Sequence, residues 1–175
     1  MRATVKDLTR VLAPNPSVLT GPGTNTFVLG TRDRVVIDPG PDDDTHLAAI
    51  LAAAAGRVSH ILVTHAHRDH SAGAARLAQM TAAPVLAFGD AMAGRSALMR
   101  NLAAQGLVAG GEGLDHGFSP DITLRDHETV ATPAGEVMAL HTPGHSGGHL
   151  CFGWQGMLFS GDIVMGWTST LISPP

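Results

Sequence analysis

The sequence predicts an α/β protein, and three features of the chain indicate this fold class. Short apolar runs bounded by glycine, proline and polar turns alternate with Ala- and Leu-rich segments between residues 26 and 88. Residues 57–88 have the order strand, helix, strand, which favours a parallel crossover. The last third of the chain is again rich in strand-forming runs. With 175 residues, 44% of them hydrophobic, the chain suits a single domain, 1–175, that buries its core without disulfides.

The individual elements follow from local sequence signals. Apolar runs closed by prolines or turn residues predict strands, and Ala-rich segments that begin with acidic or small residues predict helices. In chain order we expect a strand at 5–12, a hairpin at 26–30 and 34–38, a helix at 44–55, a strand at 57–64, a helix at 71–80, a strand at 84–88 and a helix at 96–105. Further strands are expected at 122–124, 128–131, 135–141, 149–154 and 157–159. His46 lies in the first turn of its helix and is expected to face solvent.

Composition argues against some functional classes and indicates a cellular compartment. The net charge of −4 argues against a broad basic surface for nucleic acid. No run approaches the ~18 apolar residues that span a bilayer, so no membrane partner is expected. The first ten residues lack the apolar core of a secretory signal, which predicts a cytoplasmic protein. The one cysteine, Cys151, suits a buried strand position better than catalysis.

Four side chains that can bind metal follow the strand expected at 57–64. His65 and His67 are two residues apart, so in an extended segment they project to one side. Asp69 and His70 follow where the chain turns toward a helix and can face the same space from another direction. Since one ion cannot comfortably take all four groups, the cluster favours two ions, ~3.5–4 Å apart as in known hydrolytic sites.

Three acidic or imidazole side chains elsewhere also follow strands. His145 and Asp162 lie in glycine-bearing turns and are candidate additional ligands, His145 for the first ion and Asp162 as a bridge between both. Asp38 ends the second strand of the expected hairpin. It either orients a metal-bound histidine or only caps a turn.

Residues 64–70, 141–146 and 160–162 resemble, in the same order, the successive metal motifs of the metallo-β-lactamase fold hydrolases. The resemblance implies an αββα sandwich with the site between its two sheets. It implies Zn²⁺ as the cofactor, with two ions in the complete site, although iron or manganese also suits these ligands. It places His65, His67 and His145 on the first ion, Asp69 and His70 on the second, and Asp162 between them.

Residues 15–17, 21–26 and 160–166 resemble more narrowly the lactamase-beta-like group, whose animal members cleave single-stranded RNA. These motifs consist mostly of scaffold residues, and thioester hydrolases of the glyoxalase II type share the same metal residues. Both single-stranded RNA and a small-molecule thioester therefore remain candidate substrates.

One departure from the family pattern concerns the second ion. The pattern requires a further histidine on a later strand, but the sequence ends at Ser173-Pro174-Pro175. We therefore expect a domain that is incomplete at its C-terminal end. Its second site would be completed by water, by another copy in a homo-oligomer, or by a missing C-terminal segment.

These residues lead to one main hypothesis and two alternatives. The main hypothesis is a hydrolase that uses a metal-activated water, with Asp69 as the catalytic residue that orients it. The first alternative is a mononuclear iron enzyme of the sulfur dioxygenase type; the related di-iron group is disfavoured because it has Glu where this chain has His67. The second alternative is a metal-binding fragment without catalysis.

Overall fold

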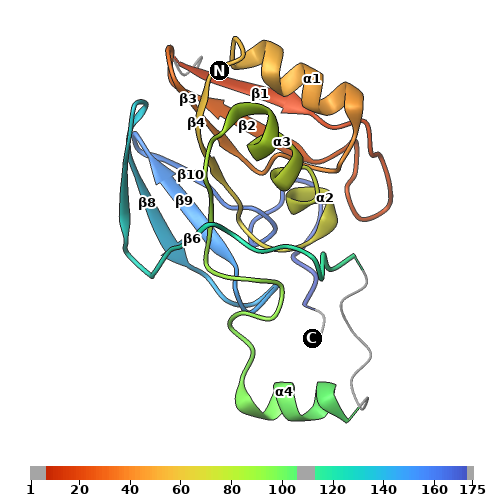
Figure 1. Cartoon of the computed structure of the whole chain (residues 1–175). Helices are drawn as coiled ribbons and strands as arrows, with labels where there is room; N and C mark the ends of the chain where they lie inside the picture. The colour runs from red at the N-terminus through yellow and green to blue at the C-terminus, as the bar shows by residue number, and fades with distance from the viewer. Residues whose placement is uncertain (1–6, 106–112, 173–175) are drawn as a thin grey trace.

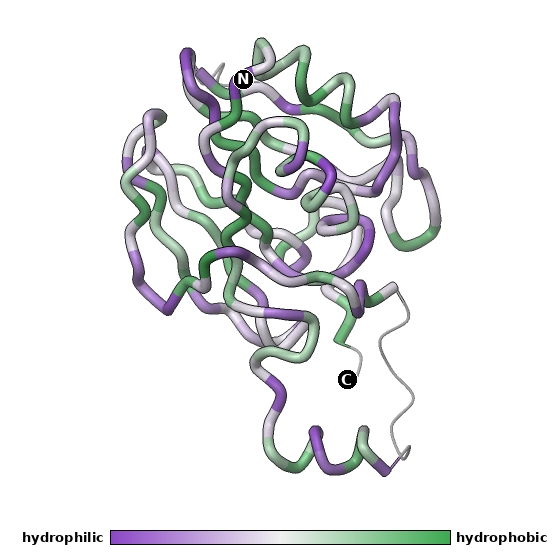
Figure 2. Tube along the Cα trace, viewed as in Figure 1, coloured by the Kyte–Doolittle hydropathy of each residue, from purple (hydrophilic) through white to green (hydrophobic). Residues whose placement is uncertain are grey.

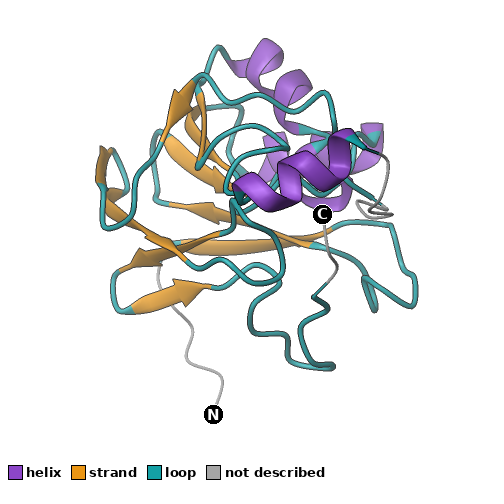
Figure 3. Ribbon diagram, turned by 90° about the horizontal axis from the view of Figure 1, so that it is seen from below, coloured by secondary structure: helices purple, strands orange, loops and turns teal. Residues whose placement is uncertain are grey.

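The computed structural model describes residues 7–105 and 113–172. Two β-sheets pack face to face, and helices lie on the outer side of the first sheet (Figure 1 and Figure 3). The predicted α/β class is therefore confirmed. This arrangement leaves the loops at one end of both sheets close together, and these loops carry the residues that the sequence singled out.

The first sheet contains six strands in chain order. They are β1 (Leu8–Leu12), β2 (Asn25–Leu29), β3 (Arg34–Ile37), β4 (Val58–Leu62), β5 (Val85–Ala87) and β6 (Ile122–Thr123). Strands β1 to β3 are antiparallel, and β3 to β6 are parallel. The predicted hairpin and the predicted crossover are thus confirmed. The part of the predicted first strand that precedes residue 7 lies outside the described residues.

The second sheet contains four antiparallel strands in the order β10-β9-β8-β7. They are β7 (Thr129–Thr132), β8 (Gly135–His141), β9 (Leu150–Trp154) and β10 (Met157–Phe159). All four lie within two residues of the predicted boundaries. The turn between β8 and β9 contains His145, and the chain reaches Asp162 directly after β10.

Alternate residues of the strands fill the space between the two sheets. Ile37 and Leu62 of the first sheet meet Phe152 and Trp154 of the second in one buried cluster. The indole N–H of Trp154 donates to the carbonyl of Ala134 at 2.8 Å, so its polar atom is paired inside the core. Hydrophobic residues recur along the strands of both sheets in Figure 2, as this packing requires.

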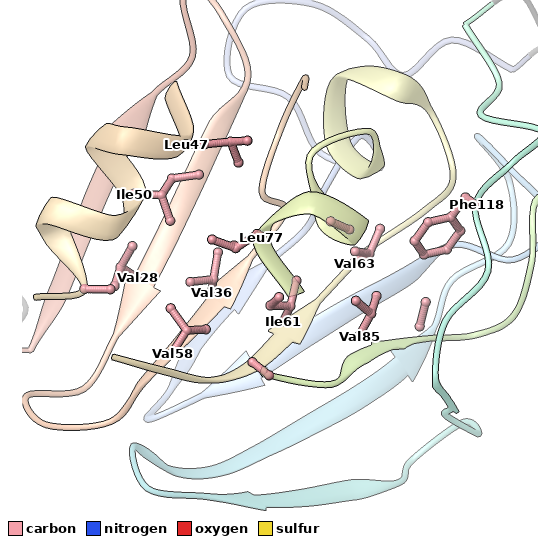
Figure 4. Packing of buried hydrophobic residues seen from close by; sticks show 14 of the residues in the cluster. Val28, Val36, Leu47, Ile50, Val58, Ile61, Val63, Leu77, Val85 and Phe118 are labelled. Carbon is pink, nitrogen blue, oxygen red and sulfur yellow. The ribbon is translucent and has the colours of Figure 1, made fainter. Parts of the chain in front are cut away.

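The helices are α1 (Asp44–Ala53), α2 (Arg68–Ser71), α3 (Ala74–Thr81) and α4 (Ala97–Ala104). Helix α1 begins at Asp43, whose carboxylate accepts from the His46 N–H at 2.8 Å. Leu47 and Ile50 of α1 and Leu77 of α3 pack on the outer face of the first sheet (Figure 4). Helix α4 lies apart from both sheets (Figure 1). Among the described residues, no helix packs on the outer face of the second sheet, and none is long and apolar enough to cross a membrane.

The expectation that His46 faces solvent is wrong, because its side chain is only 1% exposed. The Thr26 hydroxyl donates to the carbonyl of Asp38 at 2.6 Å, so it accepts from Nε2–H of His46 at 2.8 Å. His46 therefore ties α1 to the end of β3. His46 does lie in the first turn of the helix, as predicted, but the helix presents this position to the sheet.

Candidate metal centre

Loops from both sheets meet at the carboxyl end of β4, and they bring together every side chain that the sequence predicted as a ligand. His65 and His67 lie in the extended segment after β4, and Asp69 and His70 lie in the short helix α2. The β8–β9 turn contributes His145, and the turn after β10 contributes Asp162. The centre is therefore built from both sheets, and only their packing closes it.

Three imidazoles form the first group. Nε2 of His65 lies 3.0 Å from Nδ1 of His67, and Nε2 of His145 lies 2.9 Å from the same atom. Burial lowers the pKa of His65 well below its ordinary value and lowers that of His67 to about 4. Both rings are consequently neutral near pH 7. Three imidazole nitrogens that meet at one point form a ligand set that suits zinc-like ions.

His70 and two carboxylates form the second group. Nε2 of His70 lies 3.3 Å from Oδ2 of Asp69 and 3.3 Å from Oδ1 of Asp162. The other oxygen of Asp162, Oδ2, lies 3.5 Å from Nε2 of His145. Asp162 thus presents one oxygen to each group, which is the geometry that a bridging ligand requires.

The hydrogen bonds of three histidines fit a metal site. Nδ1–H of His70 donates to Asp38 at 2.9 Å, and Nδ1–H of His145 donates to the carbonyl of Leu171 at 2.6 Å. Nδ1–H of His65 donates to the Thr64 hydroxyl at 3.0 Å, because that hydroxyl donates its own proton to Asp38 at 2.8 Å. In each ring Nδ1 is occupied by this bond and Nε2 faces the centre, which is the atom through which such a histidine would bind a metal ion.

The charge around His70 also fits a cation. Burial by itself lowers the pKa of His70, but the charge of Asp38 and hydrogen bonds with Asp162, Asp38 and Asp69 raise it well above its ordinary value. For Asp69, burial raises the pKa, and the hydrogen bond and charge of His70 together with the Thr24 hydroxyl reverse this and lower it. Three carboxylates thus enclose one buried ring, an arrangement that a divalent ion would balance.

Asp38 lies where the sequence suggested, at the end of β3, and its side chain is buried. Besides its bonds to His70 and the Thr64 hydroxyl, it accepts the Thr64 N–H at 2.7 Å. Its backbone φ of 51° is uncommon for a residue other than glycine. Asp38 therefore orients His70 and the β4 end together, so it is more than a turn cap.

His149 is a site residue that the sequence did not single out. It is completely buried, and its ring stacks on His65 with the centroids 5.0 Å apart. Burial lowers its pKa to about 3. Nε2 of the neutral ring accepts the Asp162 N–H at 3.3 Å, and Nδ1–H donates to the Thr142 hydroxyl at 3.0 Å. His149 thus supports the turn that carries Asp162. The only sequence feature that could have pointed to a special role for His149 is the pair of glycines before it.

Gly161 provides a test of this support. A Cβ at this position would lie 2.5 Å from Nε2 of His149 and 2.9 Å from Oγ1 of Thr64. We expect Gly161→Ala to lower the free energy of unfolding by about 1–3 kcal/mol through overpacking and to displace Asp162. Urea unfolding measures this cost. Gly156→Ala is the matched control, because Gly156 also has a positive φ but no atom within 4 Å of the added Cβ. Equal costs for the two variants would show that the collision with His149 contributes nothing.

A cavity of about 1020 Å³ opens beside the first group. Arg68 and Arg95 line it. Exposed apolar side chains also line it, namely Val18, Leu19, Trp167, Leu171 and Ile172. An open site with an apolar wall and two cationic groups can receive a substrate that carries both apolar and anionic parts.

Comparisons with known proteins identify a family. The family model described as the metallo-beta-lactamase superfamily matches residues 19–174. The chain is 31% identical to an atrochrysone carboxyl ACP thioesterase of Passalora fulva, over 93% of the chain and 44% of that protein. It is 31% identical to a lactamase-like protein of Pestalotiopsis microspora, over 93% of the chain and 45% of that protein. It is also 31% identical to a beta-lactamase-like protein 2 homolog of Drosophila melanogaster, over 90% of the chain and 52% of that protein. The chain therefore spans about half the length of these curated relatives.

Solved structures show the same fold. A metallo-beta-lactamase family protein from Thermus thermophilus superposes with a TM-score of 0.71 at 23% identity, over 97% of this chain and 64% of that chain. The FEZ-1 metallo-beta-lactamase from Legionella gormanii gives a TM-score of 0.61 at 20% identity, over 87% of this chain and 58% of that chain. The two-sheet architecture and the fold predicted from the motifs agree with these neighbours.

Proposed function

The chain belongs to the metallo-beta-lactamase superfamily, and from this premise we propose that it is a metal-dependent hydrolase that acts on a thioester. The observation that carries the reaction type is the pair of adjoining ligand groups, which are joined by one carboxylate, Asp162, that faces both. Relatives named as ACP thioesterases support the substrate class.

In this proposal the site residues divide between two ions. His65, His67 and His145 would hold one ion, Asp69 and His70 the other, and Asp162 would lie between them. Imidazole and carboxylate ligands favour zinc, and they also suit iron or manganese. Bound ions of this type lower the pKa of water toward 7 and stabilise negative charge that develops on a carbonyl oxygen.

The chain's own residues have separate tasks in this proposal. The Asp69 carboxylate lies 30% exposed at the edge of the centre, where it can accept a hydrogen bond from the attacking water and orient it. The apolar wall of the cavity would hold the acyl part of the substrate, and Arg68 or Arg95 would pair with an anionic group.

The composition of the chain argues against RNA as the preferred substrate. Base stacking would require aromatic side chains, yet aromatics are only 4% of the chain. The net charge of −4 also repels a polyanion. An apolar acyl thioester needs no aromatic stacking surface, and it is not a polyanion that the net charge would repel.

A paired assay tests the proposal. The 175-residue chain, purified without added metal and analysed for its metal content, is offered an acyl-pantetheine thioester, S-lactoylglutathione, glutathione persulfide and single-stranded RNA. We expect release of free thiol from a thioester and intact RNA, with zinc in the protein. RNA cleavage without thiol release would contradict the substrate class. Iron together with oxygen consumption on a persulfide substrate would replace the proposal by the sulfur dioxygenase alternative, and a fully metallated chain inactive on every substrate would leave only the metal-binding fragment.

A further inference from the structure

We propose that Thr24 and Asn15 are positioning residues: Asn15 directs the Thr24 hydroxyl onto Asp69, and this hydrogen bond fixes the carboxylate for the second ion. We call the hydrogen bonds from Asn15 through Thr24 to Asp69 the relay. The inference rests on the proposed metal site. It gives a specific task to residues in the segments 15–17 and 21–26, whose motifs consist mostly of scaffold residues.

The contact between Thr24 and Asp69 joins two distant parts of the chain. Oγ1 of Thr24 lies 3.1 Å from Oδ2 of Asp69, across 45 residues of sequence. Thr24 is only 6% exposed, so water competes little for its hydroxyl. Asp69 is the least enclosed of the three carboxylates around His70, since its side chain is 30% exposed against 22% for Asp162 and 5% for Asp38. It therefore depends most on a partner that holds its orientation.

The direction of the Thr24 hydrogen bond follows from Asn15. The Thr24 N–H donates to Oδ1 of Asn15 at 2.9 Å, which fixes the orientation of the Asn15 amide. Nδ2 of Asn15 then donates to Oγ1 of Thr24 at 3.1 Å. Because Oγ1 already accepts this proton, its own proton is directed to Asp69. Asp69 is consequently an acceptor in this contact, which suits the ionised form that binds a metal.

The backbone around Thr24 is built to keep this relay in place. Gly23 has a φ of +136°, and a Cβ there would lie 2.1 Å from the carbonyl of Ala13. This close approach lets the Ala13 N–H donate to the carbonyl of Thr24 at 2.9 Å. The Thr20 hydroxyl donates to the carbonyl of Asn15, so the two segments are joined on both sides of the relay. A turn that only connected two strands would not need this set of contacts.

The relay reaches one ligand group and not the other. Thr24 contacts Asp69, whereas the three imidazoles of the first group have no hydrogen bond to Thr24 or Asn15 among the described residues. Loss of the hydroxyl should therefore weaken the binding of the second ion and leave the first unchanged. A general loss of stability would weaken both ions alike, so the difference between the two sites separates positioning from a merely structural role.

Three variants test the inference. Thr24→Val keeps the size of the side chain and removes the hydroxyl, Thr24→Ser keeps the hydroxyl, and Thr129→Val is the matched control on an exposed strand position. The two zinc affinities are measured by competition with a coloured chelator, and the geometry at the second site by the absorption of the cobalt-loaded protein. We expect Thr24→Val to weaken the second ion about 10–100-fold, in the range typical of residues that orient metal ligands. Thr24→Ser and Thr129→Val should both bind as the unchanged protein does.

The outcomes separate this inference from the proposed function. Unchanged affinity for the second ion in Thr24→Val would overturn the inference even if the protein hydrolyses thioesters. Weakened affinity for both ions, or no rescue by Thr24→Ser, would also overturn it. An unchanged protein that binds two ions but hydrolyses no thioester would overturn the proposed function while the affinity measurements still decide the role of Thr24. A protein that binds one ion only would overturn the inference, while the thioester assay would still decide the proposed function.

Discussion

Replacing His65 by alanine is expected to abolish turnover and to release both ions. His65 is one of the three imidazoles of the first group, and its ring nitrogen also lies within 4.8 Å of ligand atoms of His70 and Asp162. Its loss therefore removes a ligand of the first ion and disturbs the carboxylate that would lie between the two ions. Lewis-acid stabilisation of several kcal/mol would be lost, and since each 1.36 kcal/mol is a factor of ten, the rate should fall by about 1,000-fold or more. Turnover of a thioester and the metal-to-protein ratio measure the two effects. Asp69→Ala should likewise abolish turnover, since it removes the carboxylate that is proposed to orient the attacking water.

His116→Ala provides the control for these variants, because His116 is an exposed loop residue that does not line the cavity. It should keep both the activity and the metal content. Circular dichroism separates loss of ligands from loss of fold. A folded His65→Ala protein with undiminished turnover would refute the role assigned to the whole centre.

Asp38→Asn is expected to keep the fold but to disable the second ligand group. The amide has the shape of the carboxylate, and asparagine tolerates the φ of 51°. However, it places an N–H donor opposite Nδ1 of His70, which now donates to Asp38 at 2.9 Å. His70 would have to move its proton to Nε2 and point it at the metal. We expect about 10–100-fold weaker binding of the second ion, measured by chelator competition.

Two further variants isolate this effect. Asp33→Asn removes an acid of the same type in an exposed turn and should change neither affinity. Asp38→Ala leaves the buried Thr64 N–H, the Thr64 hydroxyl and His70 without their partner. It should lower the free energy of unfolding by about 3–5 kcal/mol, which a urea titration measures. Full affinity for the second ion in Asp38→Asn would show that the tautomer of His70 is not set by Asp38.

Local signals were sufficient for most of the fold. Apolar runs and the turn residues between them located strands such as β8 and β10, because periodicity and turn chemistry depend on neighbouring residues. The same signals placed Asp38 at a strand end and Asp69 in a chain reversal. They could not show that β6 joins the first sheet, since strand order depends on contacts between distant segments.

The sequence by itself determined the cluster from His65 to His70 and the order of the motifs that supply His145 and Asp162. Only the tertiary structure decided how these residues are held. His67 meets His145 across 78 residues, Asp69 meets Thr24 across 45, and Asp38 meets His70 across 32. The residues next to His149 and His46 in sequence likewise gave no signal that these two side chains are buried. The reason is physical: residue spacing fixes which side chains lie on one face of a strand or turn, whereas the packing of two sheets fixes which faces meet and which polar groups lose water.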